Sequence, residues 1–356
     1  MLTGKQFWLG LVGSLVFLAL LFYRVDLEKL GGALKGANYL FIIPSLAAYF
    51  LSVWFRTLRW QYLLRGSKRV SQGRLYPVVV MGYMANNLLP VRLGELVRAY
   101  LLGQREGISK ATALATILLE RVFDGLVLIL MGLALALFLP LGRPLADVSR
   151  ELRVPPAFVA ISIILPFVLV LGLLVAIAVY PGLASRLGSL LLRLVPLSYR
   201  TRTQRVGAMF LAGLQVLRSG SRTIGLVSLS VPIWLAEAAM YYLVMFAFSL
   251  DQPFAVALFI TSAANLAIIV PSTGGGVGPF EWAAKVSLVA LGVDDALATA
   301  YAIALHAALL IPVTLLGLVM LWLQNLSLKE LTRRPVAAWQ DGTGVSPAAS
   351  DGEGRA

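Results

Sequence analysis

Charged side chains recur inside stretches of this sequence that are otherwise apolar. Arg121 stands about ten residues into the apolar segment 111–139, and Glu237 stands near the middle of the apolar segment 224–248. A charge at the centre of a bilayer costs several kcal/mol, so each such residue requires a partner or a function. Forked guanidinium groups suit phosphate, whereas carboxylates suit an amine or a coupled proton. These residue types therefore indicate a polar cavity that accepts a charged lipid headgroup.

Two further apolar regions are each interrupted by a polar stretch that contains proline and glycine. Region 76–103 breaks at "NNLLPVRLGE" (the first elbow, 86–95), and region 254–292 breaks at "PSTGGGVGPFE" (the second elbow, 271–281). Each region is typical of two short helices joined by a turn, because open backbone at membrane depth is tolerated only where protein or a water-filled cavity satisfies it. The glycine N–H groups and the helix that begins near Pro279 predict an anion site. No strand precedes the glycines, which excludes a nucleotide-binding motif.

The candidate substrate-binding residues come from the two elbows and from the charged positions within the helices. They are Asn86, Asn87, Arg92, Glu95, Arg98, Glu120, Arg121, Asp124, Glu237, Asn265, Ser272, Thr273, Gly274, Gly275, Gly276, Gly278, Glu281 and His306. An alternative is that the charged groups only pair with one another and lock the helices together, although small residues and hydroxyl groups do this at lower cost. Arg56 and Arg59 lie near the end of their segment, where long side chains also reach the membrane surface by snorkelling.

The composition places the chain in a membrane. Of its 356 residues, 59% are hydrophobic and 13% are charged, which is more apolar surface than a soluble domain buries. The absence of cysteine excludes disulfides and thiolate chemistry, and the single histidine excludes a multi-histidine metal site. The net charge of +13 lies mostly in loops between apolar runs, which favours an anionic membrane surface over nucleic acid. We therefore expect no cofactor, no metal and no nucleic acid. Membrane lipids are the expected partners, and the sequence leaves open whether the chain forms a homo-oligomer.

Six segments have about the 20 apolar residues that a helix needs to cross a bilayer core of ~30 Å. These segments are 7–23, 39–64, 111–139, 157–180, 224–248 and 296–326. Loop 65–74 carries four positive charges and loop 186–222 carries seven arginines, and neither has an acidic residue. The positive-inside rule then puts both loops and both termini in the cytoplasm, with the chain in the plasma membrane. The two broken regions become re-entrant hairpins from opposite sides; two short complete spans are the alternative for 254–292.

Residues 1–334 are therefore expected to form one transmembrane domain of the all-α class. Within it, the basic segment 183–222 has leucines at helical spacing, which predicts an amphipathic helix on the cytoplasmic surface, with a solvated basic loop as the alternative. Residues 335–356 have no apolar periodicity and are expected to be a disordered tail.

The two halves of the sequence resemble each other. Trp54 and Trp234 lie 180 residues apart, and the Ala-Asn pairs at 85–86 and 264–265 lie 179 residues apart. Together with the loop charges, these matches predict that residues of about 39–140 and 224–326 are repeats of inverted topology. Inverted repeats with broken helices are typical of transporters.

Several stretches also resemble one known family. "GYMANNLLPVRLGELVRAYLL", "ERVFDGL", "PSTGGGVGPFEWA" and "RTLRW" are similar to the flippase-like family, also called the lysylphosphatidylglycerol synthase transmembrane region family, over roughly residues 5–326. The resemblance implies a membrane protein that moves lipids between leaflets. In the best-known members the lipid is aminoacylated phosphatidylglycerol and a soluble synthase domain follows, which we do not expect here.

The leading hypothesis is thus a translocase for an anionic or aminoacylated phospholipid or a polyprenyl-linked lipid. The alternative is a membrane enzyme or accessory subunit that acts on lipid-linked sugar or phosphate in envelope biogenesis. Such enzymes usually need an acidic metal cluster or a histidine base near one interface. Here the acidic residues of segment 111–139 lie mid-membrane beside an arginine, and His306 stands alone.

Overall fold

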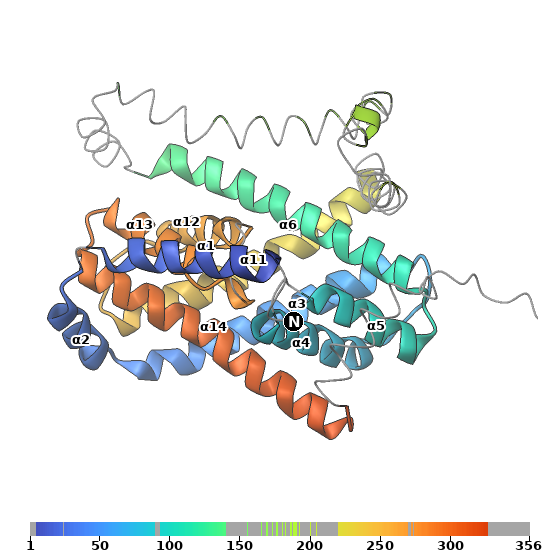
Figure 1. Ribbon diagram of the computed structural model, residues 1–356, viewed down its shortest axis with the longest axis horizontal. Coiled ribbons are helices and arrows are strands. Elements are labelled where there is room, and N and C mark those ends of the chain that lie inside the picture. Colours follow the sequence, from blue (N-terminus) through green and yellow to red (C-terminus); the bar gives the residue numbers. More distant parts are fainter. Residues whose placement is uncertain are drawn as a thin grey trace, which may run out of the picture.

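The fold is known from a computed structural model. It describes residues 5–23, 25–89, 93–139, 220–269, 272 and 274–326, with scattered residues between 155 and 204. Within these ranges every regular element is a helix, as the sequence predicts (Figure 1). The first half contains α1 (Lys5–Phe22), α2 (Leu27–Gly36), the 3-10 turn η1 (Tyr39–Phe41), α3 (Ile42–Leu64), α4 (Gln72–Leu88), α5 (Gly94–Glu106) and α6 (Lys110–Phe138). The second half contains α11 (Gly220–Ala247), α12 (Phe254–Ala267), the 3-10 turn η4 (Gly274–Gly276), α13 (Pro279–Val289) and α14 (Asp295–Leu323).

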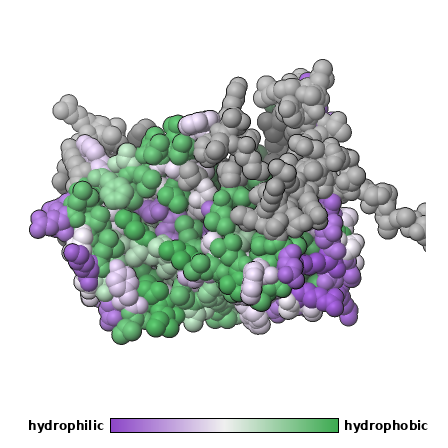
Figure 2. Space-filling view, turned by 60° about the horizontal axis from the view of Figure 1, so that its bottom comes forward, coloured by the Kyte–Doolittle hydropathy of each residue, from purple (hydrophilic) through white to green (hydrophobic). Residues whose placement is uncertain are grey.

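Several described helices are suited to a bilayer. Three are long and apolar enough to cross one, namely Tyr39–Leu64, Ile224–Ala247 and Asp295–Leu323. A fourth candidate is formed by α1 and α2 together, which are bent by 89° at their junction. Figure 2 shows hydrophobic side chains across the middle of one face and hydrophilic residues gathered at its two ends, the distribution expected of a protein that crosses a membrane several times.

Some sequence predictions concern parts of the chain outside this description. The predicted span 157–180 and the basic segment 183–222 lie largely outside the described residues, and the tail 335–356 lies wholly outside them. The predicted span 111–139 corresponds to α6, a helix of 29 residues, or about 43 Å. The six complete spans and the sidedness of the termini therefore remain predictions.

Each broken region consists of two helices that pack against each other, α4 with α5 and α12 with α13. The first elbow leaves α4 at Leu89, whose backbone is extended, and α5 begins at Gly94. In the second elbow, Gly275, Gly276 and Gly278 have φ values of 79°, 81° and 101°. Residues with a Cβ rarely adopt such angles, so the glycines are what allow the chain to turn here.

The helices of the two halves pack in matching ways. α3 lies along α11 in the largest contact between helices, α4 packs on α14, and α12 packs on α6. Likewise α5 packs on α6 and α13 on α14, so each contact has a counterpart in the other half. Glycines allow the close approaches, since Gly317 of α14 faces Met84 of α4 and Gly132 of α6 faces Ser262 of α12. The α4–α5 and α12–α13 pairs lie toward opposite ends of the molecule (Figure 1).

The two elbows touch each other inside the bundle. A Cβ added to Gly274 would lie 2.6 Å from the carbonyl oxygen of Asn87 and 3.3 Å from that of Leu89. The Asn87 amide also lies 2.9 Å from the hydroxyl of Thr314 on α14, to which it donates a hydrogen bond. The end of α4 is therefore held between the second elbow and α14.

Candidate functional site

A group of charged side chains is buried where α3, α6 and α11 meet. Asp124 of α6 is at its centre, with its carboxylate 2.8 Å from Nη2 of Arg59 and 3.6 Å from Nη1 of Arg56. Arg121, one helical turn before Asp124, approaches the same carboxylate to 3.8 Å. Glu237 of α11 accepts a hydrogen bond from Arg56. We call these five residues the central cluster.

The central cluster holds more positive than negative charge. Its three guanidinium groups face two carboxylates, which leaves a formal excess of one positive charge. Neighbouring dipoles support this arrangement, because Asn265 of α12 donates to Glu237 at 2.9 Å and Arg59 donates to the hydroxyl of Ser230 at 2.9 Å. A bound anion would offset the excess within these five residues, and Glu95 of the first elbow is a further carboxylate that interacts electrostatically with Arg121.

Arg121 differs from the other members of the central cluster. Its side chain is 34% exposed, while those of Arg56 and Arg59 are 10% and 1% exposed. Its contact with Asp124 is long for an ion pair, whereas its Nε, like that of Arg59, is buried and has no hydrogen-bond partner among the described residues. Arg121 lies eleven residues after the start of α6, or about 16 Å along the helix. It is therefore the member whose donors remain accessible to a ligand.

The central cluster corrects one expectation. Arg56 and Arg59 do not snorkel to a membrane surface; they are buried, because Asp124 and Glu237 satisfy their charge inside the bundle. The guanidinium of Arg56 also lies 4.5 Å from the ring centroid of Trp234. Their spacing of three residues, which puts both arginines on one face of a helix, was the feature of the sequence that could have indicated a shared site. The partners on α6 and α11 could not be assigned from the sequence.

The candidates of the first elbow are engaged with one another. Arg98 and Glu120 form a buried ion pair of 2.8 Å, and Arg98 lies 4.1 Å from the ring centroid of Trp60. The Asn86 side chain accepts from the N–H of Gly94 at 2.8 Å and donates to Glu95 at 3.3 Å. For these residues the contacts fit the alternative of a structural role. Arg92 lies outside the described residues.

The second elbow is closed by Glu281 and His306. Oε2 of Glu281 accepts from the N–H of Gly278 at 2.7 Å, so a carboxylate of the chain itself caps the start of α13. This contact counts against the predicted anion site, because this N–H already has its acceptor. Oε1 of Glu281 lies 2.7 Å from Nδ1 of His306, and Nε2 of His306 lies 3.1 Å from the carbonyl oxygen of Gly275. Ser272 is partly buried, and Thr273 lies outside the described residues.

Direct contacts thus sort the described candidate residues into four groups. Arg121, Asp124, Glu237 and Asn265 belong to the central cluster or bind to it. Asn86, Glu95, Arg98 and Glu120 hold the first elbow and its neighbours. Gly278 and Gly275 of the second elbow contact Glu281 and His306, respectively, whereas Gly276 faces Ile268. Asn87 joins the first elbow to α14, and Gly274 contacts its main chain.

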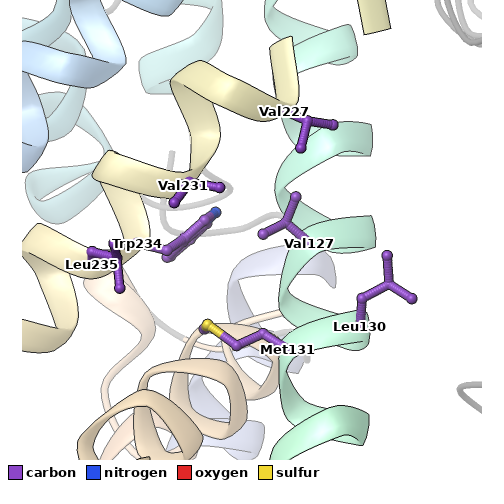
Figure 3. Close-up of a pocket in the computed structure, with 7 residues that line it drawn as sticks. All are labelled: Val127, Leu130, Met131, Val227, Val231, Trp234 and Leu235. Carbon is purple, nitrogen blue, oxygen red and sulfur yellow. The ribbon is translucent and has the colours of Figure 1, made fainter. Parts of the chain in front are cut away.

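An apolar groove lies beside the central cluster, between α6 and α11 (Figure 3). It has a volume of about 360 Å³ and is lined by Val127, Leu130, Met131, Val227, Val231, Trp234 and Leu235. Leu130 and Val231 are 52% and 47% exposed, so the groove is open at the outside of the described helices. Trp234 belongs to both places, because it lines the groove and also contacts Arg56.

Comparisons with known proteins agree with the sequence resemblance. The family model described as "Lysylphosphatidylglycerol synthase TM region" matches residues 7–317. Glycosyltransferase AglD of Haloferax volcanii is 28% identical over 320 residues, which cover 84% of this chain and 51% of AglD. The chain thus spans about half the length of that relative. Two UPF0104 membrane proteins of Methanothermobacter thermautotrophicus are 26% and 28% identical, covering 82% and 84% of this chain and 87% of each relative. No solved structure matches.

Proposed function

Because the chain belongs to the lysylphosphatidylglycerol synthase transmembrane region family, we propose that it moves an anionic or aminoacylated lipid between the leaflets of the plasma membrane. No covalent step is part of this proposal. The observation that carries it is the accessible guanidinium of Arg121 in a buried cluster with an excess of positive charge. Such a site stabilises a lipid headgroup while that headgroup is away from water.

The central cluster favours a phosphate over an amine. A phosphodiester carries one negative charge, which would offset the formal excess of the cluster, and guanidinium groups bind phosphate oxygens through paired hydrogen bonds. Both carboxylates of the cluster are already paired with arginines. An aminoacyl group would therefore be recognised elsewhere, while the phosphate that all these lipids share is held by Arg121.

The apolar groove supplies a surface for the rest of the lipid. It lies next to the central cluster, is lined by aliphatic side chains and Trp234, and is open to the outside of the described helices. A lipid with its phosphate at Arg121 would keep an acyl or prenyl chain in the groove, because the chain has no favourable place in the charged cluster. The ring of Trp234 separates the apolar and charged parts of this path.

The proposal includes the arrangement in the membrane. We expect two repeats of inverted topology, each with a re-entrant hairpin. The first repeat comprises helices α3, α4, α5 and α6, and the second comprises α11, α12, α13 and α14. Their matching helix contacts and the positions of the two hairpins in Figure 1 support this arrangement. Six complete spans and cytoplasmic termini follow from the loop charges. In this arrangement each hairpin closes the central cluster from one side.

Reconstitution into liposomes tests the function. Transfer of headgroup-labelled phosphatidylglycerol and of its lysyl derivative is measured for the wild type, for Arg121→Gln and for Arg65→Gln, a control arginine that is exposed at the end of α3. We expect at least a tenfold slower transfer for Arg121→Gln and an unchanged rate for the control. Equal rates for the wild type and Arg121→Gln, at equal protein incorporation, would contradict the headgroup role.

A second candidate is favoured by the name of one relative, glycosyltransferase AglD. It is a role in which this membrane part presents a lipid-linked sugar to a transfer reaction. The same liposomes with a polyprenyl phosphate sugar distinguish the two candidates. Intact cargo in the opposite leaflet supports translocation, whereas a sugar transferred to an acceptor or released as product supports the second role.

A further inference from the structure

The single histidine of the sequence is buried beside a carboxylate. His306 of α14 is 3% exposed, and its two ring nitrogens contact different groups of the second elbow. Nδ1 is 2.7 Å from Oε1 of Glu281, and Nε2 is 3.1 Å from the carbonyl oxygen of Gly275. Phe280 stacks on the imidazole with 4.2 Å between the ring centroids, which fixes the ring plane.

These contacts determine how many protons the pair holds. A carbonyl oxygen only accepts, so Nε2 of His306 must carry a hydrogen and donate it to Gly275. The contact between Nδ1 and Glu281 then also needs a hydrogen, because a lone pair facing a carboxylate oxygen at 2.7 Å would be repulsive. Whether that hydrogen belongs to an imidazolium or to a carboxylic acid, the pair is electrically neutral and holds one proton more than imidazole with carboxylate.

We propose that Glu281 and His306 together bind one exchangeable proton, and that this proton holds the start of α13, which follows the second elbow, against α14. On release, the proton passes to water, the pair becomes imidazole with carboxylate, and its charge changes from zero to minus one. The Nδ1 contact is then lost. His306 then keeps its hydrogen bond to Gly275 but no longer holds Glu281, so α14 loses its contact with the first turn of α13.

Other charged groups on the packed helices have their own partners. Lys285, one turn after Glu281 on α13, donates to the carbonyl oxygen of Leu21 and pairs with Asp295 at 2.9 Å. On α11, Glu237 is paired with Arg56 of α3. None of these groups contacts the Glu281–His306 pair within the described residues, so the proton is what neutralises it.

The remaining titratable groups near this place are tyrosines and the exposed charges of α2. Tyr301 donates to the carbonyl oxygen of Tyr241, whose own hydroxyl is contacted by Asn265. Tyr83 and Tyr76 are on α4, where Asn87 makes the hydrogen bond to α14. Glu28, Lys29 and Lys35 of α2 are exposed. Within the described residues, none of these tyrosines and α2 charges forms a hydrogen bond or ion pair with Glu281 or His306.

The two halves of the chain differ at this place. His306 occupies nearly the repeat position of Arg121, and Glu281 that of Glu95. The first half therefore holds a permanent charge where the second half holds a titratable pair. A proton bound or released there would act directly on the second hairpin only. The use of this asymmetry to drive lipid movement rests on the proposed translocase function, whereas the proton site itself does not.

Nitrogen NMR of the full-length protein tests the proton site without any transport assay. Because the chain has one histidine, protein with ¹⁵N-labelled histidine gives the signals of a single imidazole. We expect Nε2 to be protonated throughout a pH titration, and one proton to leave the Nδ1 side. In Glu281→Gln the amide donates to Nδ1, so Nδ1 should give the signal of an unprotonated ring nitrogen under conditions in which the wild type holds its proton; in Glu28→Gln the signals should match those of the wild type. An Nδ1–H tautomer, or no difference between wild type and Glu281→Gln, overturns the proton site.

Liposomes with an imposed pH difference test the coupling. We expect the wild-type rate of labelled phosphatidylglycerol transfer to depend on the direction of the pH difference. In the double variant Glu281→Gln, His306→Gln, neither side chain can titrate and the amide at position 306 can still donate to Gly275, so this dependence should disappear. Wild-type transfer that ignores the pH difference overturns the coupling. An absence of transfer under every condition contradicts the proposed function, while the NMR result still decides the proton site.

Discussion

Arg59 of α3 and Asp124 of α6 form an ion pair of 2.8 Å in which the side chains are 1% and 6% exposed. Breaking a buried pair by removing one partner strands a charge and costs about 3–5 kcal/mol. We therefore expect Arg59→Met to lower the melting temperature clearly, whereas Arg121→Gln removes a half-exposed group with one long contact and should change it little. Thermal unfolding of both purified variants measures this. Equal destabilisation would show that Arg121 is as structural as Arg59.

The second elbow should not tolerate a side chain at Gly276. This residue has a φ of 81°, and a Cβ there would lie 2.9 Å from the Ile268 side chain. We expect Gly276→Leu to slow lipid transfer at least tenfold while helix content by circular dichroism is preserved. Gly292→Leu is the matched control, since Gly292 also has a positive φ, 88°, but nothing lies within 4 Å of its Cβ position. It should lose about 1–2 kcal/mol of stability from backbone strain alone and keep its transfer rate.

The groove between α6 and α11 predicts a different effect for Trp234. Trp234→Ala would remove the ring that lines the groove and contacts Arg56. We expect discrimination between lipids of different chain length to weaken, because the tail surface and the headgroup site are no longer separated. Transfer rates of short-chain and long-chain phosphatidylglycerol, compared for this variant and for Leu315→Ala on the exposed face of α14, measure the discrimination. An unchanged ratio in Trp234→Ala would remove the groove from the lipid path.

The membrane arrangement predicts a pattern of chemical labelling. The chain has no native cysteine, so single cysteines report only their own position. An impermeant thiol reagent added outside cells should label cysteines at 142 and 292, and should not reach those at Ser67 or Ser221. Labelling of Ser221→Cys in intact cells would contradict the inverted arrangement.

Removal of the C-terminal residues should not change the stability of the protein. Residues 335–356 contain no apolar periodicity, so they offer nothing to bury against the helices. Truncation after Arg334 should leave expression and melting temperature unchanged in detergent. A clear fall in melting temperature would show that this segment packs on the rest of the protein.

The helices and the two elbows were predictable because their signals are local. Long apolar runs predict helices, and the proline and glycines at 271–278 interrupt one of them where the structure turns. The pairing of charges was not predictable in the same way. Glu237 pairs with Arg56, 181 residues away, and Arg59 with Asp124 on another helix, so each partner depends on how α3, α6 and α11 pack. The family was recognisable from short motifs at the two elbows and in α3 and α6, and its model matches residues 7–317.

Contact between Gly274 and the main chain of Asn87 joins two turns that belong to opposite halves of the sequence. Backbone meets backbone there, with no long side chain between them to absorb a displacement. A shift of the α12–α13 hairpin toward the end of α4 therefore has to push on it, and a shift of α4 has to push back. The two hairpins are therefore mechanically coupled: the position of one limits the positions that the other can take.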